Sequence, residues 1–300
     1  MGQARELFLF LADFHILNVC NSGQLNREYS LDLAATLLAC GLDPHRSLLY
    51  AQSAVPEVCE LMWILSCQAP FGLLTRAHSF KDKQVKGIEV NCGLFNYPIL
   101  MTADILLYDA ELVPVGKDQK QHLEMARDMA QKFNNMYGEI FKLPEPLISD
   151  DVGVVPGLDG EKMSKSKDNV ISIFATDAVW KKQVMAIVTD SKGLEESKMP
   201  GECNVYKIYK LLATQEEAQA MADSLSRGGY GYGHAKKDLL EKIKEVFSPL
   251  RDSYDDWLKR PDDLRDVVLD GSRRARDLAV AKLDQVQQAL GMLGRPRKFQ

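Results

Sequence analysis

A short run of lysines and serines is the part of the sequence best suited to phosphate chemistry. Residues 156–167, which we call the lysine-rich loop, end in Gly-Glu-Lys-Met-Ser-Lys-Ser-Lys, so that three lysines fall within six residues. Pro156, Gly157 and Gly160 disfavour regular structure, which predicts a loop. Lysine supplies compact positive charge and serine supplies donors, so this loop could bind a polyphosphate. The alternative is a solvated surface turn, because charge clusters are usually exposed.

An acidic residue in apolar surroundings is the second feature that could do chemistry. Asp104 lies in the segment Met-Thr-Ala-Asp-Ile-Leu-Leu-Tyr, residues 101–108. A partly buried carboxylate is costly unless a donor satisfies it, so Asp104 could bind a donor on an otherwise apolar ligand. Tyr97 upstream and residues 112–116 downstream would complete such a pocket. The alternative is an aspartate on the polar face of an amphipathic helix.

Alternating strands and helices must position these residues. The continuous apolar run at 7–12 is typical of a buried strand in a parallel sheet, and 47–52 predicts a second strand. Helices are predicted at 28–40, from Pro56 to about 68, and at 98–108. This order predicts an α/β fold with a parallel sheet. His15, just past the first strand, would face the crevice where such sheets bind ligands.

A possible anion site follows Asp104 along the chain. Residues 112–115 predict a short strand, Gly116-Lys117-Asp118 a turn, and 119–133 a long helix. Asp118 can cap that helix by accepting from its free N–H groups. A strand, a glycine turn and a helix N-terminus together are typical of a phosphate site.

The chain beyond the lysine-rich loop is predicted to be helical. Residues 177–188 and the segment from 205 onward carry helical patterns, and the glycines between 228 and 233 predict a joint before a helix at 235–247. We therefore predict a domain boundary near 172. An α/β domain would occupy 1–172 and an all-helical domain 173–300, which suits a chain of 300 residues.

Composition favours a soluble, cytoplasmic protein without a metal site. No stretch approaches the ~18 apolar residues of a membrane span, and the N-terminus lacks a signal-peptide pattern. None of the six cysteines forms a Cys-x-x-Cys pair. The net charge is -5, yet residues 272–300 carry seven basic and two acidic residues. Such a segment is either a basic stripe for nucleic acid or a set of solvated helix faces.

Several of these segments resemble one known family. Residues 162–166 spell Lys-Met-Ser-Lys-Ser, the mobile-loop motif of class I aminoacyl-tRNA synthetases. The chain as a whole resembles the bacterial tryptophanyl-tRNA synthetases, and the segments that carry the likeness are 13–15, 80–83, 96–108, 112–122, 133–134, 137–139, 189–191 and 231–233. The likeness covers essentially the whole chain, and the spaced motifs are highly specific in combination.

The resemblance implies a class I synthetase Rossmann-type fold with an inserted dimer-forming region and a C-terminal helical domain. It also implies a ligase: the carboxylate of L-tryptophan attacks the α-phosphate of Mg2+-bound ATP, pyrophosphate leaves, and the tryptophanyl group passes to tRNA(Trp). Positioning and charge stabilisation would do most of the catalysis. A homodimer is implied as well.

Roles for individual residues follow from the same resemblance. Asp104 would accept the indole N–H and so reject phenylalanine, which has no donor for a buried carboxylate. The other tryptophan-binding residues would be Tyr97, Met101, Val113, Val115, Gln119 and His15, although His15 could equally be structural. Contacts to ATP would come from Lys83, Gly116, Lys117, Asp118, Val155, Lys162, Met163, Ser164, Lys165 and Ser166. Lys162, Ser164 and Lys165 would stabilise the departing pyrophosphate. The helical region after 172 would dock the tRNA anticodon, and its phosphate contacts would be Arg273, Arg274, Arg276, Lys282, Arg295, Arg297 and Lys298.

The sequence also departs from the family pattern. Lys117 stands where glutamate is usual, and Phe14 and Ser79 stand where glutamine is common. The family begins with a strand and a helix bearing a HIGH-type motif, and none of the five histidines lies in such a motif. Two readings follow: a ligase, or a truncated or degenerate non-catalytic paralogue that binds tryptophan or tRNA. A tyrosyl enzyme is a rival within the first class, made less favourable by the indole-sized pocket and the Asp118-Gln119 segment.

Overall fold

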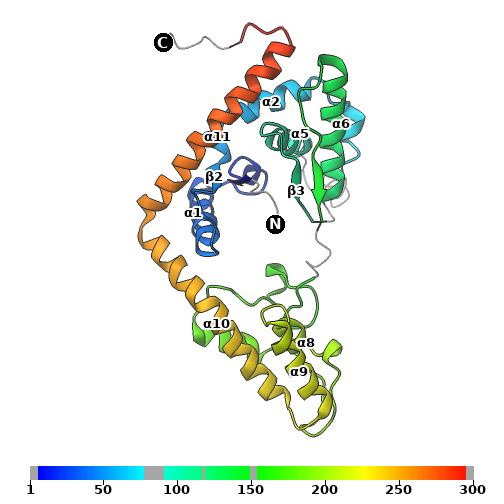
Figure 1. The fold of residues 1–300 in the computed structure, drawn as a ribbon, viewed down its shortest axis with the longest axis vertical. Coiled ribbons are helices and arrows are strands. Elements are labelled where there is room, and N and C mark those ends of the chain that lie inside the picture. The colour runs from blue at the N-terminus through cyan, green and yellow to red at the C-terminus, as the bar shows by residue number, and fades with distance from the viewer. Residues whose placement is uncertain (1–5, 78–90, 117–118, 149–153, 295–300) are drawn as a thin grey trace. The chain divides into compact units, whose positions relative to one another are not determined.

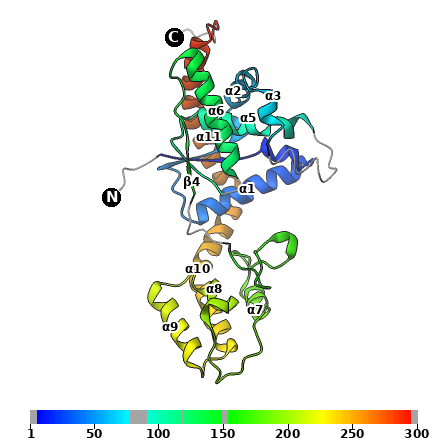
Figure 2. The ribbon, with the colours of Figure 1, turned by 90° about the vertical axis from the view of Figure 1, so that its right-hand side faces the viewer.

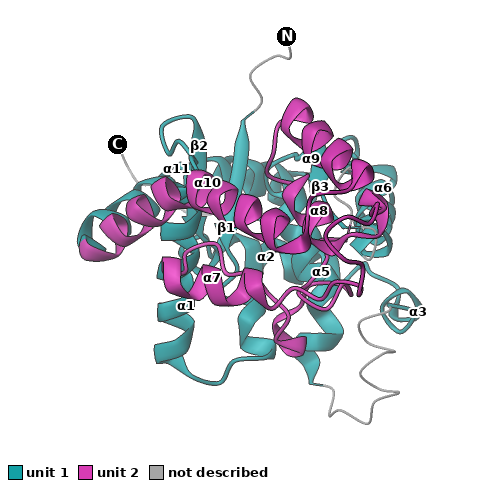
Figure 3. Cartoon of the chain, turned by 90° about the horizontal axis from the view of Figure 1, so that it is seen from below, with its two compact units in different colours: residues 1–149, 260–300 teal, residues 150–259 magenta. Residues whose placement is uncertain are grey.

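The protein folds into two compact units, and the sequence of the second unit lies between two stretches that form the first. The computed structural model describes residues 6–77, 91–116, 119–148 and 154–294. Unit 1 combines Met1–Ser149 with Arg260–Gln300, and unit 2 is Asp150–Lys259 (Figure 3). Because each unit has its own hydrophobic core, each is described by itself.

Two pairs of parallel strands organise unit 1. Strand β1 (Leu7–Leu11) pairs with β2 (Ser47–Ala51), with Leu7 opposite Ser47 and Leu11 opposite Ala51. Strand β3 (Leu112–Pro114) pairs with β4 (Glu145–Leu147). The predicted strands at 7–12, 47–52 and 112–115 and their parallel direction are therefore confirmed. Strand β4 was not predicted, because a three-residue strand containing Pro146 carries little strand pattern.

Helices connect and cover these strands. Unit 1 contains α1 (Gly23–Ala39), α2 (Glu57–Ser66), α3 (Phe71–Leu74), α5 (Cys92–Leu106), α6 (Lys120–Tyr137) and α11 (Pro261–Ala289) (Figure 1). Helices α1 and α5 begin five and six residues before the predicted starts at 28 and 98. The reason is side-chain capping: Ser22 accepts from the backbone N–H of Leu25, and Asn91 accepts from that of Leu94.

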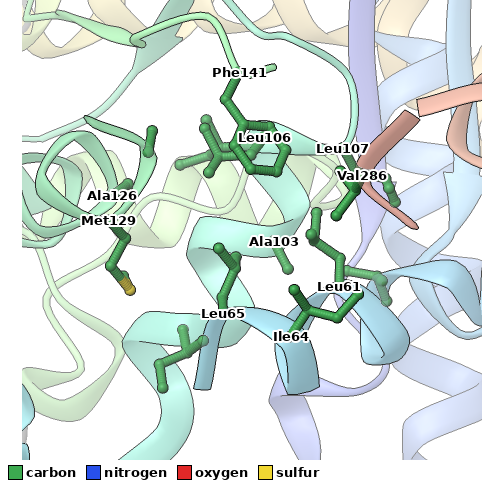
Figure 4. Packing of buried hydrophobic residues seen from close by; sticks show 14 of the residues in the cluster. Leu61, Ile64, Leu65, Ala103, Leu106, Leu107, Ala126, Met129, Phe141 and Val286 are labelled. Carbon is green, nitrogen blue, oxygen red and sulfur yellow. The ribbon is translucent and has the colours of Figure 1, made fainter. Parts of the chain in front are cut away.

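The core of unit 1 lies between α2, α5, α6 and the C-terminal part of α11. Leu61 and Leu65 of α2 are buried with Leu106 of α5 and Met129 of α6, as Figure 4 shows. Val286 of α11 is fully buried in the same cluster. The long C-terminal helix is thus part of the same core as the strands.

Small residues allow α11 to pack directly on β2. A Cβ on Gly271 would lie 2.0 Å from the carbonyl oxygen of Leu49, and Ala275 and Ala279 are fully buried. The Ser272 hydroxyl accepts from the backbone N–H of Ala51 at 3.2 Å. The predicted boundary near 172 therefore falls inside unit 2, and residues after 260 belong to unit 1. The helical pattern of this segment could not reveal that its apolar face belongs to the core around the N-terminal strands.

Unit 2 consists of helices joined by irregular segments, one of which carries the lysine-rich loop. It contains α7 (Asp177–Met185), α8 (Asn204–Tyr209), α9 (Gln215–Arg227) and α10 (Tyr232–Lys259) (Figure 2). Trp180 of α7 and Leu239 of α10 are fully buried in its core. Gly228 and Gly229 form the predicted break before α10, with φ values of 85° and 77° that glycine adopts without strain. Helix α10 begins at Tyr232, three residues before the predicted start at 235. No described helix of either unit has the length and apolarity to cross a membrane.

Candidate active site

Asp104, His15 and Gln52 form a buried polar group in unit 1, which we call the Asp104 cluster. The Gln52 side-chain amide donates to both carboxylate oxygens of Asp104, at 2.8 and 2.9 Å. His15 Nε2 lies 2.9 Å from Asp104 Oδ2. Asp104 is 7% exposed and Gln52 is 1% exposed. The cluster is therefore a carboxylate held by two donors in a largely dry environment.

The topology explains why these three residues meet. His15 begins a short 3-10 helix (His15–Asn18) after β1, and Gln52 begins another (Gln52–Ala54) directly after β2. The carboxyl ends of neighbouring parallel strands meet at one edge of a sheet, which is where such folds bind ligands. Asp104 projects from α5 to the same place. The expectation that His15 would face the ligand crevice agrees with this placement, while its role stays a prediction.

Burial and hydrogen bonding act on Asp104 in opposite directions. Burial raises the pKa of its carboxyl group, because a low-dielectric environment disfavours the charged form. The hydrogen bond and charge of His15, together with the Gln52 amide, oppose that rise in pKa. A carboxylate has about four acceptor positions, and Oδ1 has only Gln52 as a partner among the described residues. Oδ1 therefore has acceptor capacity for one more hydrogen bond.

The side chains predicted to line the tryptophan pocket are described in unit 1. Tyr97 and Met101 lie seven and three residues before Asp104 on α5, a spacing that places them on its face of the helix. The Tyr97 ring packs edge-on against His15, with centroids 4.8 Å apart. Val113 and Val115 are partly buried against the same core. An aromatic ring beside a buried carboxylate suits a flat, mostly apolar ligand that carries one hydrogen-bond donor.

Gln52 is the member of the cluster that was not predicted from the sequence. It also accepts from the backbone N–H of Phe14 at 3.2 Å, so it connects the segments after β1 and β2. Its position just past a buried strand is the signal that singled out His15. The second strand was predicted at 47–52, which includes Gln52, whereas the observed strand ends at Ala51, so the same reasoning did not single out Gln52.

Part of the predicted ATP site lies outside the described residues. This applies to Lys83, Lys117 and Asp118, and also to Ser79. Gly116 and Gln119 are described, and the backbone N–H of Gln119 donates to the Gly116 carbonyl at 3.0 Å. Gln119 is the residue before α6 and gives that helix no side-chain cap.

The lysine-rich loop of unit 2 forms a narrow hairpin. Pro156 and Lys162 make an antiparallel bridge, and the backbone N–H of Met163 donates to the Val155 carbonyl at 2.8 Å. Lys162, Lys165 and Ser166 are exposed, whereas Met163 and Ser164 are half-buried. The ammonium groups of the loop therefore face solvent on an ordered backbone, as a phosphate-binding loop requires.

The basic residues of α11 take part in contacts within unit 1. Arg276 binds the buried carboxylate of Glu57, with Nε 3.1 Å from Oε1, and so ties α11 to α2. Arg274 donates to the Pro44 carbonyl at 2.9 Å. Lys282, predicted to contact phosphate, is mostly buried, with Nζ 2.5 Å from Asp109 Oδ2. That prediction is wrong for Lys282, because its ammonium group is enclosed in unit 1. Among the described arginines of the predicted set, Arg273 has the most exposed side chain, at 73%. Arg295, Arg297 and Lys298 lie outside the described residues.

Comparison with known proteins decides which family carries these sites. Residues 3–248 match the family described as tRNA synthetases class I (W and Y). The tryptophan–tRNA ligase of Fusobacterium nucleatum is 49% identical over 288 residues, which cover 96% of this chain and 88% of the relative. The tryptophan–tRNA ligase of Campylobacter jejuni is 45% identical over 290 residues, 97% of this chain and 91% of the relative. The chain belongs to the tryptophanyl-tRNA synthetase family.

Solved structures agree with this membership. The tryptophanyl-tRNA synthetase of Campylobacter jejuni complexed with ADP and tryptophan superposes with a TM-score of 0.88 at 44% identity, covering 95% of this chain and 89% of that one. The Mycoplasma pneumoniae enzyme gives a TM-score of 0.75 at 27% identity, covering 95% and 87%. The predicted class I fold, with Rossmann-like parallel strands and a helical C-terminal region, is therefore confirmed.

Proposed function

We propose that this chain is a tryptophan–tRNA ligase, which activates L-tryptophan with ATP and transfers it to tRNA(Trp). The observation that carries the proposal is the Asp104 cluster, a buried carboxylate with an acceptor position open among apolar and aromatic side chains. Family membership supports the reaction, and the geometry of the Asp104 cluster supports tryptophan as the amino acid.

Tryptophan selection follows from the cost of an unsatisfied buried carboxylate. The indole N–H would donate to Asp104, while Met101, Val113 and Val115 line the ring. Tyr97 and Gln119 would hold the amino-acid head group, and His15 would keep Asp104 in place. A phenylalanine in the same pocket would leave the carboxylate without its last donor, which costs about 1–3 kcal/mol and more for a charged group. The site therefore selects by hydrogen bonding as well as by size.

Two segments of the chain are proposed to contact ATP, and each is described within its own unit. In unit 1 the segment at Gly116, Lys117, Asp118 and Lys83 would contact the nucleotide. In unit 2 Val155 would flank the adenine, and Lys162 to Ser166 would contact the phosphates. Mg2+ would enter with ATP, because this ion is usually held by substrate phosphates and only one or two carboxylates. Among the described residues, no group of three or more metal-ligating side chains provides a separate site.

The first step forms a bond between the tryptophan carboxylate and the α-phosphorus, and the bond to the pyrophosphate oxygen breaks. Lys162 and Lys165 would neutralise the charge that develops on pyrophosphate, with the Ser164 hydroxyl as a donor. In the second step a terminal hydroxyl of tRNA attacks the activated carbonyl and AMP leaves. This route needs no covalent intermediate with the protein.

The remaining partners rest on family likeness and charge. Arg273, Arg274 and Arg276 are proposed to contact tRNA phosphates, and Arg273 is the best placed because its side chain is the most exposed. The helical region after 172 is proposed to dock the tRNA anticodon. A homodimer and a cytoplasmic location, where translation proceeds, complete the proposal.

The test is tryptophan-dependent exchange of pyrophosphate into ATP by the purified 300-residue chain. We expect exchange that requires tryptophan and whose kcat falls about 10²–10³-fold in Lys165→Ala. A folded chain that binds tryptophan but catalyses no exchange would overturn the proposal and leave a binding protein.

A further inference from the structure

Asn169, two residues beyond the lysine-rich loop, is a buried polar residue next to exposed lysines and serines. It is 4% exposed, while Lys162, Lys165, Ser166 and Lys167 around it are exposed. A buried polar side chain is stable only when its donors and acceptors are paired. The partners of Asn169 are therefore informative about what it does.

The side-chain amide of Asn169 binds the loop on both sides of Met163. Its Oδ1 accepts from the backbone N–H of Ser164 at 2.7 Å. Its Nδ2 donates to the Asp159 carboxylate at 2.7 Å and to the Lys162 carbonyl at 3.2 Å. The two backbone groups belong to residues proposed to contact pyrophosphate. One amide thus fixes the backbone from which those side chains extend.

The opposite strand of the hairpin is fitted to the same side chain. A Cβ on Gly157 would lie 2.3 Å from Asn169 Nδ2, so only glycine leaves room for the amide. The backbone N–H of Leu158 donates to the Asn169 carbonyl at 2.9 Å. Asp168, which precedes Asn169, adopts a left-handed conformation with φ of 52°, which turns the chain back under the hairpin. Asn169 is therefore enclosed by the loop that it holds.

We propose that Asn169 is a positioning residue for ATP activation, whose amide sets the backbone of Lys162 and Ser164 so that the loop presents its charges to the departing pyrophosphate. This inference rests on the proposed function. Asn169 itself would touch neither ATP nor tryptophan.

The chemistry of an amide is what the loop requires. An aspartate at 169 has the same shape, but it would place a carboxylate oxygen against the Asp159 carboxylate and the Lys162 carbonyl. It can accept from Ser164 but cannot donate. Asn169→Asp therefore keeps the size of the side chain and reverses two of its contacts. Asn169→Ala removes all three side-chain contacts without adding charge.

The first readout is steady-state kinetics of tryptophan-dependent ATP–pyrophosphate exchange. We expect Asn169→Asp and Asn169→Ala to lower kcat about tenfold or more, in line with the loss of two or three hydrogen bonds around the catalytic loop. The KM for tryptophan should not change, because the Asp104 cluster belongs to unit 1. Ser172→Asp is the matched control, since it adds the same charge three residues away, where Ser172 bonds through its backbone.

The second readout is trypsin cleavage after the lysines of the loop, followed by mass spectrometry at a temperature where the chain is folded. Both Asn169 variants should be cut there faster than wild type and Ser172→Asp, with unchanged cleavage in unit 1. Cleavage can be measured in an inactive chain, so this readout tests the role of Asn169 separately from the proposed ligase function. If wild type lacks exchange but the cleavage pattern holds, the proposed function fails and the positioning role of Asn169 in the loop survives.

Two results would overturn the inference. One is a folded Asn169→Asp or Asn169→Ala chain with wild-type kcat and wild-type cleavage of the loop. The other is a variant whose KM for tryptophan rises and whose melting temperature falls along with kcat, which would make Asn169 an ordinary core residue of unit 2.

Discussion

The Asp104 cluster and the lysine-rich loop handle charge in opposite ways. Asp104 carries a charge that is buried and bound by two donors, with a small remaining acceptor capacity. The lysines of the loop carry exposed charges, and only their backbone is fixed. A buried site discriminates between ligands because an unpaired polar group is costly there. An exposed loop cannot discriminate in this way, but it can supply charge to a polyphosphate.

Removing one exposed charge should have the largest effect on rate and almost none on stability. Lys165→Ala should lower kcat for ATP–pyrophosphate exchange about 10²–10³-fold, the usual cost of losing one group that stabilises transition-state charge. The melting temperature should stay at the wild-type value, because the side chain is exposed. Lys181→Ala, which removes an exposed lysine from α7, is the control. Equal kinetics for the two variants would contradict the role of Lys165.

Removing one buried partner should affect both activity and stability. Gln52→Leu takes away the donor to both Asp104 oxygens and the acceptor for Phe14. We expect kcat/KM for tryptophan to fall about 5–30-fold and the free energy of unfolding to fall by about 1–3 kcal/mol. Chemical denaturation and exchange kinetics measure both. Gln24→Leu on the exposed face of α1 is the matched control, and a Gln52→Leu chain that behaves like it would show that the cluster does not need its amide.

The packing of α11 on β2 predicts a change in stability alone. Gly271→Ala places a methyl group within 2.0 Å of the Leu49 carbonyl, so helix and strand must separate. Overpacking of this kind costs about 1–3 kcal/mol. Gly23→Ala, where nothing lies within 4 Å, is the control. If Gly271→Ala unfolds like the control, residues after 260 do not form part of the unit 1 core.

The smallest predicted effect is a pH dependence that comes from Asp104. Its folded-state pKa is raised by burial, so the folded state binds this proton more tightly than the unfolded state. Its contribution to stability is therefore most favourable below the ordinary pKa of aspartate and declines as pH rises through the raised value. Relative to Asp104→Asn, the wild-type chain should gain stability as pH falls through this window. Denaturation curves at a series of pH values test this, and the opposite slope would contradict it.

Much of the fold could be predicted because its signals are local. The buried strands, the α/β alternation and the helical C-terminal region all follow from apolar patterns within one segment. The placement of α11 could not be predicted, because the partner of its small residues is a strand more than 200 residues away in sequence. Helix starts were also missed where Ser22 and Asn91 extend a helix beyond its apolar pattern.

Site residues could be predicted from the sequence where they stand in a distinctive local motif. Asp104 and the lysine-rich loop stand in distinctive segments, so both were found from the sequence. Gln52 and Asn169 act by holding other residues, and their importance comes from contacts that only the structure gives. Lys282 is the opposite case: its basic segment predicted a phosphate contact, but its ammonium group pairs with Asp109 inside unit 1.

The central claim is that the Asp104 carboxylate selects tryptophan by accepting its indole N–H. The most direct measurement compares kcat/KM in ATP–pyrophosphate exchange for tryptophan and for the isosteric analogue in which sulfur replaces the indole N–H. The wild-type chain should favour tryptophan by about 100-fold or more, because the analogue leaves a buried acceptor unpaired. In Asp104→Leu, shown to be folded by its melting curve, that preference should shrink to a few-fold. A wild-type chain that activates both compounds equally, or an Asp104→Leu chain that keeps the full preference, would contradict the account.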